Sequence, residues 1–149
     1  MGLISIARLT ILFSLFAVIA SADMKKTAPG ITDGKLAACP SSPNCVCSQD
    51  PDNDHRTASI PYSGSSADAK VKIKKILMER ARTKLAAETE NYIHFECRSF
   101  IFGFVDDVEF FFPKDIKEIH VRSASRTGHY DFKVNRTRID DIRASFATL

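Results

Sequence analysis

The sequence predicts an α+β domain, an antiparallel meander sheet with two helices packed on one face. Apolar and polar residues alternate at a spacing of two through much of the region 86–125, which is typical of strands with one buried face. Before and after this region, apolar residues recur at steps of three and four, as in amphipathic helices. With 149 residues, the chain has room for one such domain.

The first 22 residues have the features of a secretory signal peptide. Arg8 provides a weakly positive start, residues 9–20 form an apolar run, and small residues at 20–22 provide a cleavage site. The run is shorter than the about 20 residues of a membrane-spanning helix. We therefore expect cleavage after Ala22, an exported (periplasmic or secreted) mature protein, and no stable transmembrane segment in it.

The charge of the expected mature chain excludes one class of partner. Removing residues 1–22 takes away only Arg8, so 20 of the 21 basic residues and all 18 acidic residues remain, a net charge of about +2. No block combines basic and aromatic residues in the way that nucleic-acid-binding surfaces do. We expect no nucleic-acid partner and no cofactor.

Two segments lack the periodicity of regular structure. Residues 23–38 combine lysines with proline and glycine, which predicts a flexible leader before a single domain over residues 39–149. Residues 39–62 contain four prolines and several serine and asparagine residues, so a loop is expected there. The cysteines are the candidates for holding that loop in place.

The helix that precedes the sheet has a clear start. Ser65 or Ser66 can cap it, and Asp68 in its first turn is favoured by the helix dipole. Its apolar stripe comprises Ala69, Ile73, Ile76, Leu77, Ala81 and Leu85. The basic residues lie mostly off this stripe, which indicates a solvated face.

Four strands are predicted after it, at residues 86–88, 92–98, 105–112 and 118–125. Short connections at Asn91, Gly103 and Pro113 join them into a meander. A last helix is expected to begin near Asn135, a good N-cap residue. It would bury Ile139, Ile142 and Phe146.

The central hairpin has a register that parity restricts. Facing residues of an antiparallel pair point to the same side, and the apolar positions are even-numbered in 105–112 and odd-numbered in 118–125. Paired numbers therefore sum to 229 or 231, which places Arg122 opposite Asp107 or Glu109 on the polar face. We expect a partly exposed ion pair there, worth on the order of 0.2–1 kcal/mol.

Polar residues of the central stretch are the candidate site: Asp107, Arg122, Ser123, Ser125, Arg126, Asp131, Asn135 and Arg136. Three arginines among them could form an anion-binding cluster, because guanidinium groups match carboxylate and phosphate. In the alternative interpretation the arginines are already engaged by carboxylates, and Asn135 only caps a helix.

Metal sites match the sequence poorly. Zinc would need Cys39, Cys45 and Cys47 with His55, at spacings that are unusual for zinc. Asp50, Asp52 and Asp54 resemble the start of a calcium loop, but His55 stands where glycine is required. We expect no metal. In an exported protein, four cysteines suggest two disulfides, with three possible connectivities.

Three ordered motifs, "CPSSPNCVCS", "FVDDVEF" and "VRSASRTGHYDFKVNR", carry a family resemblance. With them the chain resembles the family catalogued as domain of unknown function 1499, over roughly residues 36–146. The resemblance implies no activity. It implies that Cys39 pairs with Cys45, since both match the family pattern. Cys47 and Cys97 stand where serine and an apolar residue are usual, so these two are expected to pair with each other.

The resemblance bears on two more residues. Leu36-Ala37-Ala38-Cys39 has the letters of a lipoprotein cleavage box, but Cys39 is better explained as the first residue of the Cys-Pro motif. A lipid anchor at Cys39 therefore stays an alternative only. Lys133 stands where the family commonly has glycine, which puts in doubt a turn with positive φ at that point.

The sequence favours a non-catalytic role over an enzymatic one. We expect the protein to bind a small anionic ligand, or a cell-envelope partner, through the polar face of the sheet. One alternative is a hydrolase-type enzyme that uses Asp131 with Arg122 and Arg126. Another is a structural or interaction module.

Overall fold

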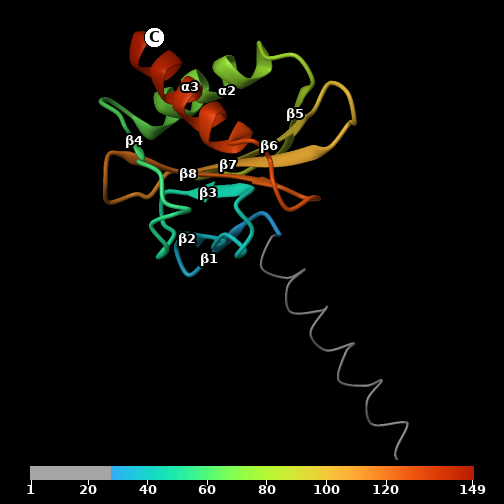
Figure 1. The fold of residues 1–149 in the computed structure, drawn as a ribbon. Coiled ribbons are helices and arrows are strands. Elements are labelled where there is room, and N and C mark those ends of the chain that lie inside the picture. Colours follow the sequence, from blue (N-terminus) through green and yellow to red (C-terminus); the bar gives the residue numbers. More distant parts are fainter. Residues whose placement is uncertain (1–27) are drawn as a thin grey trace, which may run out of the picture.

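A computed structural model describes residues 28–149, so the predicted signal peptide lies outside the described residues. The main sheet is antiparallel, in the order β3-β8-β7-β6-β5 (Figure 1). Its strands are β3 (Cys45–Cys47), β5 (Thr83–Glu88), β6 (Tyr92–Arg98), β7 (Val105–Phe111) and β8 (Glu118–Ser125). The short β4 (Ile60–Pro61) also pairs with β8. The segment predicted as a loop over residues 39–62 thus contributes two strands to one sheet edge.

Two helices cover one face of this sheet, α2 (Ser66–Met78) and α3 (Val134–Thr148) (Figure 1). The predicted α+β fold, a meander sheet with two helices on one face, is confirmed. None of the helices in the described part of the chain has the length and apolar character of a membrane span.

The start of α2 is as predicted, whereas its end comes earlier. Ser65 is the N-cap, and its Oγ accepts a hydrogen bond from the backbone N–H of Asp68 at 3.0 Å. The helix stops at Met78, and Arg82 then takes a φ of +57°, which a helix does not allow. Leu85, predicted on the helical stripe, therefore lies in β5, where it pairs with Phe95.

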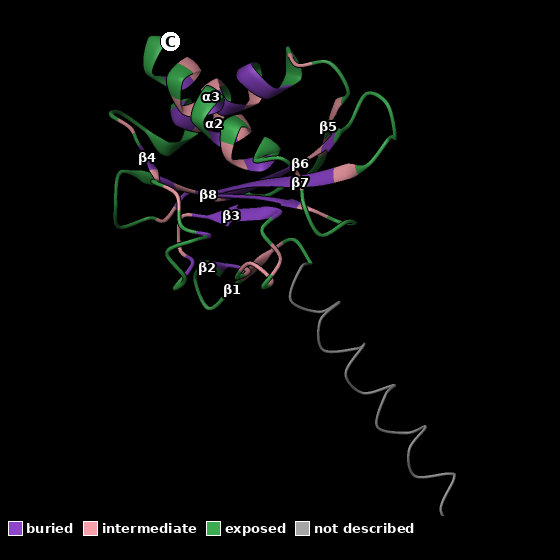
Figure 2. Ribbon diagram, in the orientation of Figure 1, coloured by how far each residue is buried: buried purple, intermediate pink, exposed green. Residues whose placement is uncertain are grey.

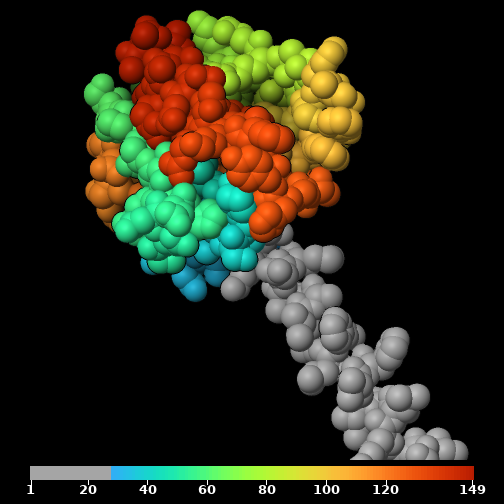
Figure 3. Space-filling view, viewed as in Figure 1, coloured from blue at the N-terminus to red at the C-terminus, as the bar shows by residue number. Residues whose placement is uncertain are grey.

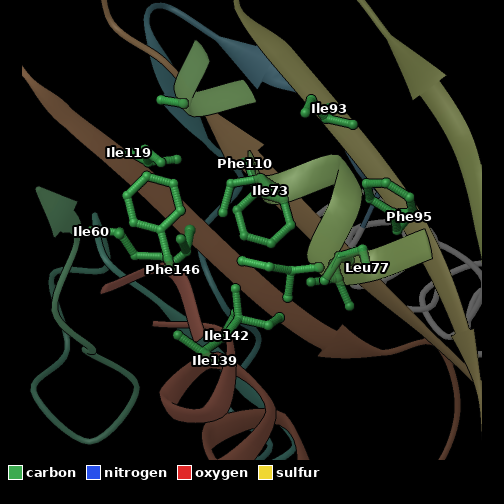
Figure 4. Close-up of a cluster of buried hydrophobic side chains, with 14 of the residues drawn as sticks. Ile60, Ile73, Leu77, Ile93, Phe95, Phe110, Ile119, Ile139, Ile142 and Phe146 are labelled. Carbon is green, nitrogen blue, oxygen red and sulfur yellow. The ribbon is translucent and has the colours of Figure 1, made fainter. Parts of the chain in front are cut away.

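The apolar core lies between the helices and the sheet. It joins residues of α2, such as Ile73 and Leu77, to residues of α3, such as Ile139 and Ile142. From the sheet come Phe95 and the other inward side chains of β6, β7 and β8 (Figure 4). Strands β3, β6, β7 and β8 are buried along most of their length (Figure 2). Burial of these side chains supplies the main favourable term in folding.

The opposite face of the sheet is covered as well, by a hairpin of β1 (Ile31–Thr32) and β2 (Lys35–Leu36). Leu36 is buried in a second apolar cluster with Cys47, Tyr92 and Phe111. This hairpin lies within the segment 23–38 that was predicted to be a flexible leader. For residues 31–36 that prediction is wrong, because apolar contacts hold them against the sheet.

The register of the central hairpin follows the parity prediction. In the pairing of β7 with β8, Glu109 faces Arg122 and Phe110 faces Val121, so that paired numbers sum to 231. The ion pair is present, but its environment differs from the prediction. The side chains of Glu109 and Arg122 are both 0% exposed, because the β1–β2 hairpin covers this face.

One of the two predicted disulfides forms. Cys39 and Cys45 are bonded, as predicted, whereas Cys47 and Cys97 are buried free thiols, so their predicted pairing is wrong. Cys97 belongs to the helix-side core and Cys47 to the cluster on the opposite face. Two strands also lie between β3 and β6, which separates the thiols by roughly 14 Å at a strand spacing of about 4.8 Å.

Candidate functional site

The sheet divides the predicted site residues into two groups. Asp107, Arg122 and Arg126 lie on the face away from the helices, where Arg126 pairs with Asp107 and Arg122 pairs with Glu109. The others lie on the helix side, near the start of α3: Ser123, Ser125, Asp131, Asn135 and Arg136. Arg122, Arg126 and Arg136 therefore do not assemble into one anion-binding cluster. Nor does Asp131 lie with Arg122 and Arg126, as the hydrolase hypothesis requires.

Arg122 of the first group pairs with a buried carboxylate, Glu109, which two further groups also contact. Glu109 Oε2 accepts from Arg122 Nη1 at 2.7 Å, and Oε1 accepts from the Tyr92 hydroxyl at 2.8 Å. The backbone N–H of Gly30, just before β1, donates to the same Oε1 at 2.7 Å. Burial, together with the charge of Glu109, raises the pKa of Tyr92 far above its ordinary value. The phenol therefore stays protonated and remains a donor.

A second carboxylate of this face, Asp107, is buried and pairs with the partly exposed Arg126. His94 Nε2 lies 2.6 Å from Asp107 Oδ1, and Arg126 donates to both oxygens, at 2.9 and 2.7 Å. Arg126 also donates to Glu96 at 2.6 Å. Burial alone would raise the pKa of Asp107, but the hydrogen bonds from His94 and Arg126 outweigh it and hold that pKa below its usual value.

Acid should therefore destabilise the protein through Asp107. A carboxyl group whose pKa is lower in the folded state stabilises it above the unfolded pKa of about 4, and this contribution is lost as the pH falls through the folded pKa. We expect the free energy of unfolding, measured with denaturant, to fall between about pH 5 and about pH 3. Asp107→Asn should make this fall shallower; an unchanged pH dependence in the variant would contradict the assignment.

The second group centres on Asn135, which is buried inside α3. Its Nδ2 donates to Asp131 Oδ2 at 2.7 Å, and lies 3.0 Å from Ser125 Oγ and from the backbone oxygen of Asn44. Its Oδ1 accepts from the Ser123 hydroxyl and from Arg138. Asn135 thus joins β8, the residue just before β3 and α3 in one hydrogen-bonded cluster.

Asn135 does not cap α3, so that prediction is wrong. The helix begins at Val134, and Asp131 accepts the backbone N–H groups of Lys133 at 3.0 Å and Asn135 at 2.9 Å. Asp131 therefore performs the capping, while the side chain of Asn135 points into the buried cluster. Phe132 and Lys133 have φ values of +54° and +64°. The positive-φ turn is thus present even though lysine stands at that point.

Two members of the Asn135 cluster, Arg138 and Asn44, were not among the residues predicted for the site. Arg138 donates to Ser123 and Asn135, and also to Asp106 at 2.6 Å. Asn44 accepts from the backbone N–H of Ser125 and donates its side-chain N–H to Gly128 at 2.6 Å. The position of Arg138, three residues after Asn135 on the same helix face, is the signal that would have found it.

Beside the Asn135 cluster is a cavity of about 270 Å³, between β3 with its flanking segments and the turn that leads into α3. Its lining residues are Ser41, Pro43, Cys45, Val46, Asp52, Asp54, His55, Tyr130, Asp131, Lys133 and Arg136. Of the predicted site residues, it contains only Asp131 and Arg136. We call it the α3 cavity.

Arg136 is fixed at the α3 cavity by backbone contacts. Its Nη1 donates to the carbonyl oxygen of Arg56 at 3.0 Å, and its Nη2 to that of Asp54 at 2.8 Å. Within residues 28–149, neither Arg136 nor Lys133 has a carboxylate within 4.0 Å. Both charges are therefore available to a ligand.

The described residues contain no group of three or more histidine, cysteine, aspartate or glutamate side chains placed to hold a metal ion. A model of the family described as protein of unknown function (DUF1499) matches residues 35–146. The chain belongs to this family. No curated protein matches the sequence significantly.

The DUF1499 match includes most, but not all, of the features described above. The buried ion pair, the Asn135 cluster and the α3 cavity all lie within residues 35–146, whereas β1 and Gly30 precede the matched region. The family description names no activity. A function for the chain therefore has to come from the geometry of its own residues.

Proposed function

We propose that the protein is an exported, non-catalytic binding protein that holds a small ligand with an anionic group in the α3 cavity. Arg136 is the main support for this proposal. Two carbonyl oxygens hold its guanidinium in place, and no carboxylate among the described residues neutralises it. Its remaining N–H groups can donate to a carboxylate or phosphate, and Lys133 adds a second cation beside it.

The acidic residues of the α3 cavity restrict the ligand further. Asp131 has both oxygens occupied by N–H groups of its own turn and of Asn135. Asp52 and Asp54 also line the cavity. These two would accept hydrogen bonds from an ammonium or hydroxyl group at the other end of the ligand. A zwitterion such as a free amino acid matches this arrangement better than a simple anion does.

Export is supported by two features. The N-terminal 22 residues have the composition of a signal peptide, and the Cys39–Cys45 disulfide is typical of an oxidising compartment. The disulfide also shapes the site. Cys45 lines the α3 cavity, and its bond to Cys39 holds the residues between the two cysteines beside the cavity.

A calorimetric titration tests the binding site, with glycine as the zwitterionic probe, acetate as the simple anion and methylamine as the simple cation. We expect glycine to bind more tightly than either of the others. Arg136→Ala should weaken glycine binding roughly tenfold or more, because a charge-assisted hydrogen bond contributes about 1.5–3 kcal/mol. Lys133→Gly should weaken it too, without straining the turn, since φ is +64° there.

Arg98→Ala is the matched control, because Arg98 is an exposed arginine at the end of β6, outside the α3 cavity. It should leave glycine binding unchanged. The proposal fails if none of the probes binds, or if Arg98→Ala weakens binding as much as Arg136→Ala does. Export is tested separately, by N-terminal sequencing of the protein purified from its host, which should begin at Asp23.

A further inference from the structure

The loop between β6 and β7 holds a concentration of exposed apolar side chains. Four of its residues, Phe100, Ile101, Phe102 and Phe104, are between 52% and 80% exposed. We call these four residues the apolar tip. Apolar patches of this kind are rarely left in water without a binding role.

The backbone of this loop is tied down, so the exposure is built in. The N–H of Ser99 donates to the carbonyl oxygen of Phe104 at 2.9 Å, and the N–H of Phe104 donates back to Ser99 Oγ at 3.0 Å. Gly103 supplies the positive φ, +65°, that the turn requires. The rings of Phe102 and Phe104 stack at 5.5 Å. In the space-filling view the loop protrudes at the edge of the molecule (Figure 3).

A second loop adds two aromatic rings at the same end of the sheet. Tyr130 and Phe132, between β8 and α3, are exposed and contact each other edge to face at 5.1 Å. The N–H of Arg126 donates to the carbonyl oxygen of Val105 at 3.0 Å, which places the start of this loop beside the end of the tip. Six of the exposed large apolar side chains thus belong to two neighbouring loops.

The base of the apolar tip is basic. Arg82 lies over the ring of Phe100, at 5.0 Å from its centroid. The N–H of Arg98 donates to the carbonyl oxygen of Arg82 at 3.0 Å, so the two arginines are adjacent. The nearby acidic residue, Glu96, pairs with Arg126 at 2.6 Å and with Arg98 at 3.6 Å, so two arginines share this one carboxylate. The surface around the tip therefore favours an anionic partner.

We infer that the apolar tip inserts into the surface of a lipid bilayer that contains anionic headgroups. A protruding loop matches a bilayer better than a folded partner, which would have to supply a groove of complementary shape. Phenylalanine and isoleucine side chains would enter the boundary between headgroups and acyl chains. Arg82 and Arg98 would meet the lipid phosphates at the level where their side chains emerge.

Vesicle flotation tests this inference with the protein purified from its host. The vesicles contain phosphatidylcholine alone or with about one-third phosphatidylglycerol. Phe100→Ser/Phe102→Ser should reduce the partition coefficient roughly tenfold or more, because two large apolar side chains no longer leave water. Arg82→Gln should weaken binding to the anionic vesicles more than to the neutral ones.

Val71→Ser/Met78→Ser is the matched control, since both residues are exposed apolar side chains on α2. It should leave the partition coefficient unchanged. The chain contains no tryptophan, so Phe102→Trp provides a single reporter whose fluorescence should shift to shorter wavelength with anionic vesicles. All of these residues are exposed, so each variant should keep its fold. An unchanged melting temperature checks this.

The inference is overturned if the tip variant floats with the vesicles as well as the unaltered protein does, or if the control pair loses as much binding. It is also overturned if the unaltered protein fails to bind anionic vesicles. Association into dimers that the tip variant abolishes, without vesicle binding, would assign the tip to contact with a second copy of the chain. None of these outcomes affects the α3 cavity, because the glycine titration contains no lipid.

Discussion

Replacing Arg122 by alanine is expected to lower the free energy of unfolding by about 3–5 kcal/mol, as for other buried ion pairs that lose one partner. Arg122 and Glu109 are 0% exposed, so the substitution leaves a carboxylate inside the protein without its cation. The hydrogen bonds from Tyr92 and Gly30 to Glu109 would remain, but they do not replace the lost charge. Denaturant unfolding measures the change directly.

Two further variants separate charge from packing. Arg122→Met/Glu109→Gln removes both charges, keeps much of the volume and leaves an amide oxygen to accept from Tyr92 and Gly30, so it should recover part of the stability lost in the single variant. Lys114→Ala removes one partner of an exposed pair with Glu90 and should change stability by less than about 1 kcal/mol. If Arg122→Ala behaved like Lys114→Ala, the face covered by the β1–β2 hairpin would have to be open to water in solution.

The sheet and its register were predictable from the sequence because a period of two leaves little freedom. Val108 and Phe110 must share a face with Ile119 and Val121, and the length of the turn between the strands leaves only two odd sums. Pairing in the structure selects one of them. The direction of each side chain of the central hairpin was therefore available before its surroundings were known.

The burial of Glu109 and Arg122 was not predicted from the sequence. Alternation shows that Glu109 and Arg122 share a face, and charged residues ordinarily lie at the surface. That this face is buried depends on a hairpin whose strands have two residues each, too short for any periodicity. The dipeptide Asp33-Gly34 was the sequence signal for this hairpin, because tight two-residue turns favour it. In the structure both residues have the positive φ of such a turn.

The predicted site residues lie in two separate groups for a related reason. Proximity in sequence does not show on which side of the sheet a residue lies, and the odd and even residues of β8 separate Ser123 from Arg122. Cys47 could not be assigned to a face either, because β3 gave no alternation that would identify it as a strand. The α3 cavity brings His55 together with Arg136 across a long segment of chain, which no local pattern reports.

Asn135→Ala is expected to cost about 3 kcal/mol or more of stability, several times the roughly 1 kcal/mol of a lost N-cap. The amide of Asn135 links three segments, and its removal leaves Arg138 and Ser123 without their shared acceptor. The backbone oxygen of Asn44 would lose a donor at the same time. Each buried polar group left unsatisfied costs on the order of 1–3 kcal/mol.

Asp131→Ala serves as the comparison, because Asp131 performs the capping that Asn135 does not. It should cost less than Asn135→Ala, and the order of the two values distinguishes a cluster from a cap. A double-mutant cycle between Asn135→Ala and Ser123→Ala should be strongly non-additive, since both residues belong to one network. Equal costs for Asp131→Ala and Asn135→Ala, with additive behaviour in the cycle, would show that the amide contributes no more than a helix cap. Glycine binding in the α3 cavity then provides an independent readout, because a loosened cluster would also displace the start of α3, where Lys133 and Arg136 lie.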